Sequence, residues 1–254
     1  MRALAFLSKY LGIHDEFRAL IRSYGLKWSN GNSDDLIIAR LTKSRNREEL
    51  FDWLSEVKDR IPLISVFADF IMATGLRFGE AVSAFNLIIE LSARGRLGEY
   101  YDLERQVLEH YKFKEVFIRR SKKVFMSFVP RDLVERVAAS ERQLQPYDIQ
   151  NWLKRAGLRL RFSDCREFYA SNMTKHLSVP EVDFVQGRTT ASVFMRNYFN
   201  PTWIADLGER AIRGEQEIIE MGRMRRARWS EADQKGELKL LQGMSVSPLK
   251  VAYR

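Results

Sequence analysis

Arg188 and Tyr198 are a guanidinium and a phenol that lie ten residues apart, and these two groups can do chemistry together. They belong to the segment Gln186–Phe199, Q-G-R-T-T-A-S-V-F-M-R-N-Y-F, in which a glycine-arginine turn precedes a short predicted helix. A phenolate is a nucleophile, and nearby cations lower the pKa of a tyrosine from its reference value of about 10. Most tyrosines near an arginine are ordinary half-buried rings. The interpretation therefore depends on whether other segments bring more cations to the same place.

A first further cation follows a long apolar run. The run Pro62–Ala73 predicts a central buried helix, and T-G-L-R-F-G-E-A-V-S comes directly after it. Gly75 is a good residue to end that helix, and Arg77 opens the next one. Glu80 lies three residues on, on the same helical face. The pair is either a structural salt bridge at a helix junction or a carboxylate that holds a guanidinium for a ligand oxyanion.

Four more cations lie between two β-rich runs. The sequence E-V-F-I-R-R-S-K-K-V-F-M-S-F-V-P predicts a hairpin with strands Val116–Arg119 and Val124–Val129. Like charges at a hairpin tip repel one another, which favours a bound polyanion over a solvated turn. The four cations of this tip are Arg119, Arg120, Lys122 and Lys123.

Arg166 is predicted to lie near the start of another helix. In F-S-D-C-R-E-F-Y-A-S, Ser163 or Asp164 is expected to cap a helix that has Arg166 in its first turn. A cation there opposes the helix dipole at a cost of a few tenths of a kcal/mol, roughly. The placement indicates a site at which the guanidinium and free helix N–H groups bind an anion together.

The bulk composition points to a polyanionic partner. The chain has 254 residues, 45% hydrophobic residues and a net charge of +9. This charge favours nucleic acid first and an anionic membrane surface second, with simple solubility as the alternative. No apolar run approaches the roughly 20 residues that span a bilayer. One cysteine, Cys165, and three scattered histidines exclude disulfides and a cysteine-rich zinc site. We expect a cytoplasmic, metal-free protein.

Both ends of the chain are predicted to be helical. Residues 1–30 contain two short amphipathic stripes. Trp203 to about Trp229 predicts a long polar helix whose end, R-M-R-R-A-R-W, is either a phosphate-binding site or a solvated basic terminus. Ser230 and Asp233 could cap one more helix, and the last ten residues have the composition of a tail.

Taken in order, these motifs resemble the tyrosine recombinase (phage integrase) family over about residues 48–200. The likeness is greatest to archaeal virus- and plasmid-encoded integrases. T-G-L-R-F-G-E-A is similar to the first-arginine motif and F-S-D-C-R-E-F-Y-A-S to the helix of the second arginine, which implies Arg77 and Arg166. I-R-R-S-K-K-V-F is similar to the catalytic-lysine hairpin, with Lys122 the better match and Lys123 the second. V-Q-G-R-T-T-A-S-V-F-M-R-N-Y is similar to the motif that ends in the nucleophile, which implies Tyr198.

The resemblance also implies a fold and a domain division. The fold is mainly α with a small β-sheet or hairpin, as in the catalytic domain of this family. Residues 1–45 are expected to be the last part of a core-binding domain plus a linker, so that most of that domain is missing. Residues 46–200 are the expected catalytic domain, and residues 201–254 a helical extension and tail.

Two positions depart from the common family pattern. Ser163 stands where the family usually has histidine. Arg188 stands where it usually has histidine or another donor, one residue farther from the tyrosine than is common. We interpret Arg188 as a third cation at the same phosphate.

The implied activity is site-specific cleavage and rejoining of DNA through a 3′-phosphotyrosyl intermediate. Arg77 and Arg166 would clamp phosphate oxygens, and Lys122 would donate the proton to the leaving oxygen. No Asp/Glu cluster suited to magnesium is evident, which predicts chemistry that needs neither metal nor ATP. The expected partners are double-stranded DNA attachment sites and a tetramer of the chain in the synapse. DNA contacts are assigned to Arg119, Arg120, Lys123 and Arg196.

Two other functions remain open on the sequence alone. A type IB topoisomerase shares this chemistry but acts as a monomer. A non-catalytic DNA-binding protein, descended from an integrase, would explain the missing histidines.

Overall fold

The computed structural model describes residues 2–26, 37–38, 42, 47–119, 123–188 and 193–244. The chain divides into two compact units, Met1–Asn46 and Arg47–Arg254, and each is considered by itself. Of the predicted site residues, Arg120 and Lys122 lie outside the described part.

The first unit is a pair of short helices, as the sequence predicts. They are α1 (Arg2–Tyr10) and α2 (His14–Ser23), joined at Gly12, which has a positive φ of 74°. The Ser8 hydroxyl and His14 Nδ1 lie 2.9 Å apart and tie the two helices together. Two helices of this length can bury little apolar surface. Phe6 and Tyr10 accordingly remain exposed.

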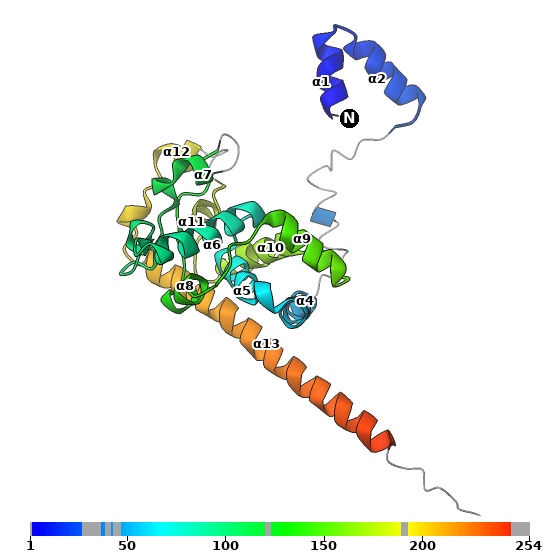
Figure 1. The fold of residues 1–254 in the computed structure, drawn as a ribbon. Coiled ribbons are helices and arrows are strands. Elements are labelled where there is room, and N and C mark those ends of the chain that lie inside the picture. Colours follow the sequence, from blue (N-terminus) through cyan, green and yellow to red (C-terminus); the bar gives the residue numbers. More distant parts are fainter. Residues whose placement is uncertain are drawn as a thin grey trace, which may run out of the picture. The chain divides into compact units, whose positions relative to one another are not determined.

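A buried helix forms the centre of the second unit, and its prediction is confirmed. Pro62 starts a 3₁₀ turn, η1 (Pro62–Ile64), which leads directly into α5 (Ser65–Thr74). Seven of the ten residues of α5 are apolar, and seven of the ten are buried. Five helices contact it (Figure 1). They are α4 (Arg47–Arg60), α6 (Phe78–Ala93), α8 (Arg131–Ala138), α10 (Phe162–Met173) and α13 (Leu207–Met244).

The β-structure is a small antiparallel sheet, and the predicted hairpin is only partly correct. Its strands are β1 (Tyr101–Asp102), β2 (Val107–Leu108) and β3 (Ser127–Phe128), in that order. The predicted second strand contains β3, whereas the first half of the predicted first strand is helical. It overlaps α7 (Lys114–Phe117), and the predicted pairing is reduced to one bridge between Ile118 and Lys123.

Aromatic spacing explains why this strand is replaced by a helical turn. Phe113 and Phe117 are four residues apart, and both pack against the buried ring of Tyr100, with centroids 5.2 and 6.0 Å away. Phe117 is also 4.3 Å from the buried ring of His110. Burial of two rings on one helical face outweighs the strand propensity of the intervening Val116.

The remaining elements complete a mainly helical fold with a small sheet, so the predicted fold class is confirmed. Two short 3₁₀ turns flank the sheet, η2 (Leu97–Glu99) and η3 (His110–Lys112), and a third, η4 (Pro201–Trp203), precedes α13. The other helices are α9 (Pro146–Arg155), α11 (Val179–Val185) and α12 (Val193–Asn197). In the described chain, no single helix has the length and apolar character of a membrane span, and η1–α5 with α6 meets that test only as a pair bent by 118°.

The last helix is longer than the sequence predicts. Pro201 forms η4, and α13 then runs without a break from Leu207 to Met244. Ser230 and Asp233 therefore lie inside it and cap no separate helix, because no proline interrupts the run. The predicted tail beyond Met244 lies outside the described residues.

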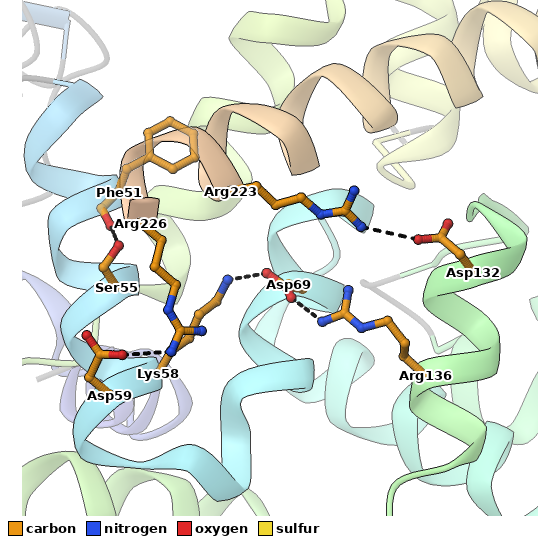
Figure 2. Close-up of polar contacts among 9 residues, drawn as sticks. All are labelled: Phe51, Ser55, Lys58, Asp59, Asp69, Asp132, Arg136, Arg223 and Arg226. Carbon is orange, nitrogen blue, oxygen red and sulfur yellow. Dashed lines mark hydrogen bonds and ion pairs between the residues drawn. The ribbon is translucent and has the colours of Figure 1, made fainter. Parts of the chain in front are cut away.

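Carboxylates of other helices hold the basic segment Arg223–Arg228, which lies inside α13. Arg226 contacts Asp59 of α4 at 2.7 Å, and Arg223 contacts Asp132 of α8 at 3.5 Å (Figure 2). Arg225 makes two bonds to Asp52, of 2.6 and 2.9 Å. Three arginines of this segment therefore join α13 to α4 and α8, which favours a structural role for them.

A second charged group lies beside these pairs. Figure 2 shows Asp69 of α5 between Lys58 of α4 and Arg136 of α8. The Arg136 Nη2 to Asp69 Oδ2 distance is 2.5 Å, and Lys58 donates to the other oxygen. A carboxylate this close to the core needs its charge compensated. Asp69 therefore links three helices that pack around the centre of the fold.

Candidate active site

Three of the predicted site residues come together where α5, α10 and α11 meet. Burial, and then the positive charges of Arg77 and Arg188, lower the pKa of Arg166 to about 10. Coulomb interactions weaken with distance, so the three guanidinium groups share one region. Arg166 still carries its charge at neutral pH. The region therefore has an excess of positive charge, which favours an anionic ligand.

Arg77 is held by the helix that it opens. α5 ends at Gly75, whose φ of 57° is the left-handed conformation that glycine adopts at low cost. Arg77 is the N-cap of α6, and Glu80 in the first turn reaches back to it. Glu80 accepts from the Arg77 backbone N–H at 3.2 Å and from Nη1 at 2.8 Å. The Glu80 side chain is 1% exposed and that of Arg77 is 28% exposed, so a buried carboxylate orients a partly open guanidinium.

Arg166 is held by two main-chain carbonyls from different helix ends. Its Nη1 donates to the carbonyl of Gly75 at 2.7 Å, and its Nη2 donates to that of Gln186 at 2.6 Å. These bonds use two of the five N–H groups of a guanidinium, so others can still donate to a ligand. The predicted position in the first helical turn is wrong. Phe162 begins α10, which makes Arg166 its fifth residue.

The predicted cap of α10 is also wrong. The N-cap is Arg161, so neither Ser163 nor Asp164 occupies the cap position. Asp164 instead accepts from Arg161 Nε at 2.9 Å, because a carboxylate in the first turn is well placed to bind a preceding guanidinium. The argument from the helix dipole thus loses its basis, and the case for Arg166 rests on its carbonyl bonds and its neighbouring cations.

Arg188 is less firmly held than the other two arginines. Its backbone N–H donates to Asp183 at 2.7 Å and closes the end of α11. Its side chain is 44% exposed, and its Nη1 lies 3.7 Å from Asp183 Oδ1. A guanidinium with this exposure can turn toward a ligand that binds beside Arg166.

The turn before Arg188 packs directly on the predicted lysine segment. Gly187 has a φ of 66°, and a Cβ there would lie 1.6 Å from the carbonyl oxygen of Lys123. Only glycine, which has no Cβ, can lie this close to the Lys123 carbonyl. The contact places Lys123, which is half-buried, beside the arginine turn, whereas Arg119 is exposed. Lys122 and Arg120 are outside the described residues, and of Arg196 only the helical backbone is described.

A small cavity opens beside two of the arginines. It has a volume of about 210 Å³, and its polar lining includes Arg77, Ser163 and Arg166. Leu76, Phe78, Leu160 and Phe162 form the apolar wall. Ser163 is exposed and fills less space than the histidine that is common at this position. The cavity has room for an anion or for a larger side chain.

A larger cavity lies elsewhere, and none of the predicted site residues lines it. Its volume is about 710 Å³, and it lies between the β1–β2 turn and the start of α13, with Arg105, Phe128 and Arg213 among its lining residues. Glu104 and Glu209 offset its two arginines. The charge balance therefore favours the arginine cluster as the anion site.

Tyr198 directly follows α12 and is presented to solvent. Its side chain is 73% exposed, and its backbone N–H donates to Phe194 at 2.9 Å. The next residue, Phe199, packs on Phe184 of α11 with centroids 5.2 Å apart and anchors the segment. No contact in the described part joins the Tyr198 hydroxyl to an arginine of the cluster.

Neither histidine of the second unit supplies the group that Ser163 lacks. His110 is fully buried between Tyr100 and Ser127, and burial lowers its pKa to about 3. His176 Nε2 lies 2.8 Å from Glu217 Oε2, and His14 belongs to the first unit. His110 and His176 therefore make contacts within the fold, as expected from a sequence with no histidine motif.

The buried residues that pack around Arg166 were not predicted from the sequence. Gln186 is buried and bonds to the Arg166 backbone. Tyr169 packs against Gly75 and donates to Glu215 of α13 at 3.2 Å. Burial raises the pKa of Glu215 well above its usual range. The only signal for Gln186 was a polar residue at a helix position where the pattern of Val182 and Val185 calls for an apolar one.

Residues 44–209 match the sequence profile of the archaeal phage integrase family, which is more than half of the 254-residue chain. The chain belongs to the archaeal phage integrase family. No curated protein and no solved structure matches it. The matched segment includes the arginine cluster and Tyr198, and family membership gives the protein a role in DNA integration and recombination, with DNA as its partner.

Proposed function

We propose that this integrase cleaves and rejoins attachment-site DNA through a covalent bond to Tyr198. The observation that carries the proposal is the convergence of Arg77, Arg166 and Arg188, with the Arg166 guanidinium fixed by two carbonyls. Phosphoryl transfer depends mainly on positioning and on stabilising charge at the phosphoryl oxygens. Clustered guanidinium groups provide this stabilisation, and Arg77 and Arg166 can each donate twice to a phosphate.

The bonds and protons of the transfer step can be assigned to residues of this chain, the DNA and solvent. The Tyr198 phenolate, formed by loss of the phenol proton to solvent, attacks the scissile phosphorus, and the bond from phosphorus to the 5′ oxygen breaks. Lys122, or Lys123 in its place, gives its proton to the leaving 5′ oxygen, which a guanidinium does not readily do. The 5′ hydroxyl of another strand reverses the step and joins new partners, so the energy of the phosphodiester bond is kept without ATP.

The contact between Gly187 and Lys123 supports the lysine assignment, since it brings the lysine segment to the turn that carries Arg188. Arg188 acts as a third donor to the phosphate. Arg119, Arg120, Lys123 and Arg196 contact the DNA backbone. The synapse contains double-stranded attachment sites and, we propose, four copies of the chain.

An adduct assay tests this proposal. The protein is incubated with a nicked DNA that carries its attachment site, and denaturing gels reveal protein–DNA adducts. We expect an adduct with wild type, none with Tyr198→Phe, and no loss of adduct after treatment with a chelator. An equal adduct with Tyr198→Phe would refute the nucleophile assignment. Binding without any adduct would favour the non-catalytic DNA-binding function.

Two further measurements separate the remaining alternatives. Relaxation of supercoiled DNA by a monomer, without strand exchange between two sites, would favour a type IB topoisomerase. DNA affinity should fall steeply as salt rises, because phosphate contacts release counterions. A flat salt response would contradict the role of the basic surface.

A further inference from the structure

Gln186 combines complete burial with several contacts to one arginine. Its side chain has 0% exposure at the end of α11. Its side-chain Nε2 donates to the backbone carbonyl of Arg166 at 3.1 Å. Its main-chain carbonyl accepts from Arg166 Nη2 at 2.6 Å. One residue therefore holds both the main chain and the guanidinium of Arg166.

The same side chain also reaches the second support of Arg166. Gln186 Nε2 lies 3.4 Å from the Gly75 carbonyl, which accepts from Arg166 Nη1 at 2.7 Å. A Cβ on Gly75 would lie 2.4 Å from the ring of Tyr169 and 2.9 Å from Gln186 Nε2. The group is so closely packed that Gln186 cannot shift without moving a carbonyl that orients the guanidinium.

Stability alone does not account for a glutamine at this place. The buried Oε1 of Gln186 has no hydrogen-bond partner among the described residues. A buried polar atom without a partner destabilises the folded state. Methionine has a similar size and shape and would avoid that cost. The amide N–H bonds of Gln186 to the Arg166 and Gly75 carbonyls are contacts that an apolar side chain could not make.

We propose that Gln186 is a positioning residue that sets the orientation of the Arg166 guanidinium at the scissile phosphate. This inference rests on the proposed transfer of the phosphate to Tyr198. Gln186 does not touch the phosphate; it fixes the two carbonyls and the backbone segment that aim the guanidinium. Because an error of about 1 Å in position can cost about 100-fold in rate, a residue one contact away from the substrate can control cleavage.

The first test replaces Gln186 by methionine. We expect Gln186→Met to lower the single-turnover rate of adduct formation by roughly 10- to 100-fold. DNA affinity should stay within about twofold, since Arg166 remains charged, and the melting temperature should be unchanged or higher. Asn172→Leu is the matched control: Asn172 is also a buried amide, on the helix of Arg166, with an unpartnered Nδ2. It should cleave at the wild-type rate.

A double-mutant cycle then separates positioning from a purely structural role. If Gln186 acts through Arg166, Gln186→Met should change the cleavage rate by less than about twofold in an Arg166→Ala background. The same large decrease in both backgrounds, accompanied by a lower melting temperature, would assign Gln186 to the fold and overturn the inference. Wild-type cleavage by Gln186→Met would overturn the role of Gln186 and leave the proposed function standing. Absence of a Tyr198 adduct with the wild-type protein would overturn both.

Discussion

The arginine cluster and the Tyr198 segment differ in how firmly the fold holds them. Arg166 is bound by two carbonyls, and Arg77 by a buried carboxylate. Tyr198 is 73% exposed, and its segment is anchored by the neighbouring side chains of Met195, which is buried, and Phe199, which packs on Phe184. The part of the site that neutralises phosphate charge is thus preorganised, as electrostatic catalysis requires. The nucleophile lies on a less constrained segment, so its delivery to the phosphate is the step that DNA binding and assembly can control.

Removing the fixed part of the site should cause a large loss of cleavage activity. Arg166→Ala should raise the barrier to cleavage by about 3–4 kcal/mol, or roughly 10²- to 10³-fold in rate. Arg166→Lys should lose nearly as much, because an ammonium cannot reach two carbonyls and the phosphate with one planar group. Single-turnover adduct formation measures both, with the exposed Arg96→Ala as control. Wild-type cleavage by Arg166→Lys would show that the geometry of the guanidinium is unimportant.

The proton donor can be separated from the arginines by changing the leaving atom. Lys122→Ala should slow cleavage of normal DNA by roughly 10²- to 10⁴-fold, the usual contribution of a general acid. A substrate with sulfur at the scissile 5′ position needs no proton, since a thiolate is a good leaving group, and should restore the rate. Lys123→Ala is the matched comparison. Rescue of Lys123→Ala and not of Lys122→Ala would exchange the two assignments.

Loosening the tyrosine segment should have a smaller effect than losing an arginine. Phe199→Ala removes the ring that packs on Phe184, and we expect cleavage to fall about 10-fold while DNA affinity stays unchanged. Trp203→Ala, at a side chain that is 85% exposed, should have no effect. A decrease as large as that of Arg166→Ala would contradict the idea that the segment is already loosely held in wild type.

The Tyr169–Glu215 pair behind the cluster predicts a pH effect on stability. Burial raises the pKa of Glu215, whereas an unfolded glutamate titrates near about 4.3. Above that pH the folded protein therefore binds more protons than the unfolded protein. Its free energy of unfolding falls as the pH rises. Glu215→Gln keeps an acceptor for Tyr169 but cannot ionise. Its melting temperature should match wild type near pH 4 and exceed it by a few degrees, roughly, at pH 8. A difference that is constant with pH would refute a protonated Glu215.

The smallest effect should come from the arginines that serve the fold. Arg226 is paired with Asp59, so Arg226→Ala should lower the melting temperature by less than about 3 °C and leave DNA affinity and its salt dependence unchanged. If the basic segment Arg223–Arg228 of α13 bound phosphate instead, Arg226→Ala would lower the steepness of log affinity against log salt by about one. Arg119→Ala, on the predicted DNA surface, is the comparison that should show such a change.

Local features of this fold were readable from the sequence because their causes are local. The apolar run ending at Gly75 specified a buried helix with a left-handed stop, and the spacing of Arg77 and Glu80 specified their contact. The strand predicted at Val116–Arg119 failed because burial of Phe117 against Tyr100 depends on a distant part of the chain. The division of residues 1–45, 46–200 and 201–254 stays a prediction.

The candidate site was readable only in part for the same reason. Motif order pointed to Arg77, Arg166 and Arg188, but their shared region depends on tertiary packing around α5. Gln186 had no motif of its own, because its role depends on two carbonyls that the fold brings to it. The partners of the α13 arginines could not be assigned either, since Asp52 and Asp59 lie far away in sequence.

The most direct test of the account is to locate the covalent bond. The adduct from a nicked attachment-site substrate is digested with protease and nuclease, and tandem mass spectrometry identifies the residue that carries the nucleotide. We predict a 3′-phosphonucleotide on Tyr198. The same modification on another residue, or no modification while the DNA is bound, would contradict the assignment of Tyr198 as the nucleophile.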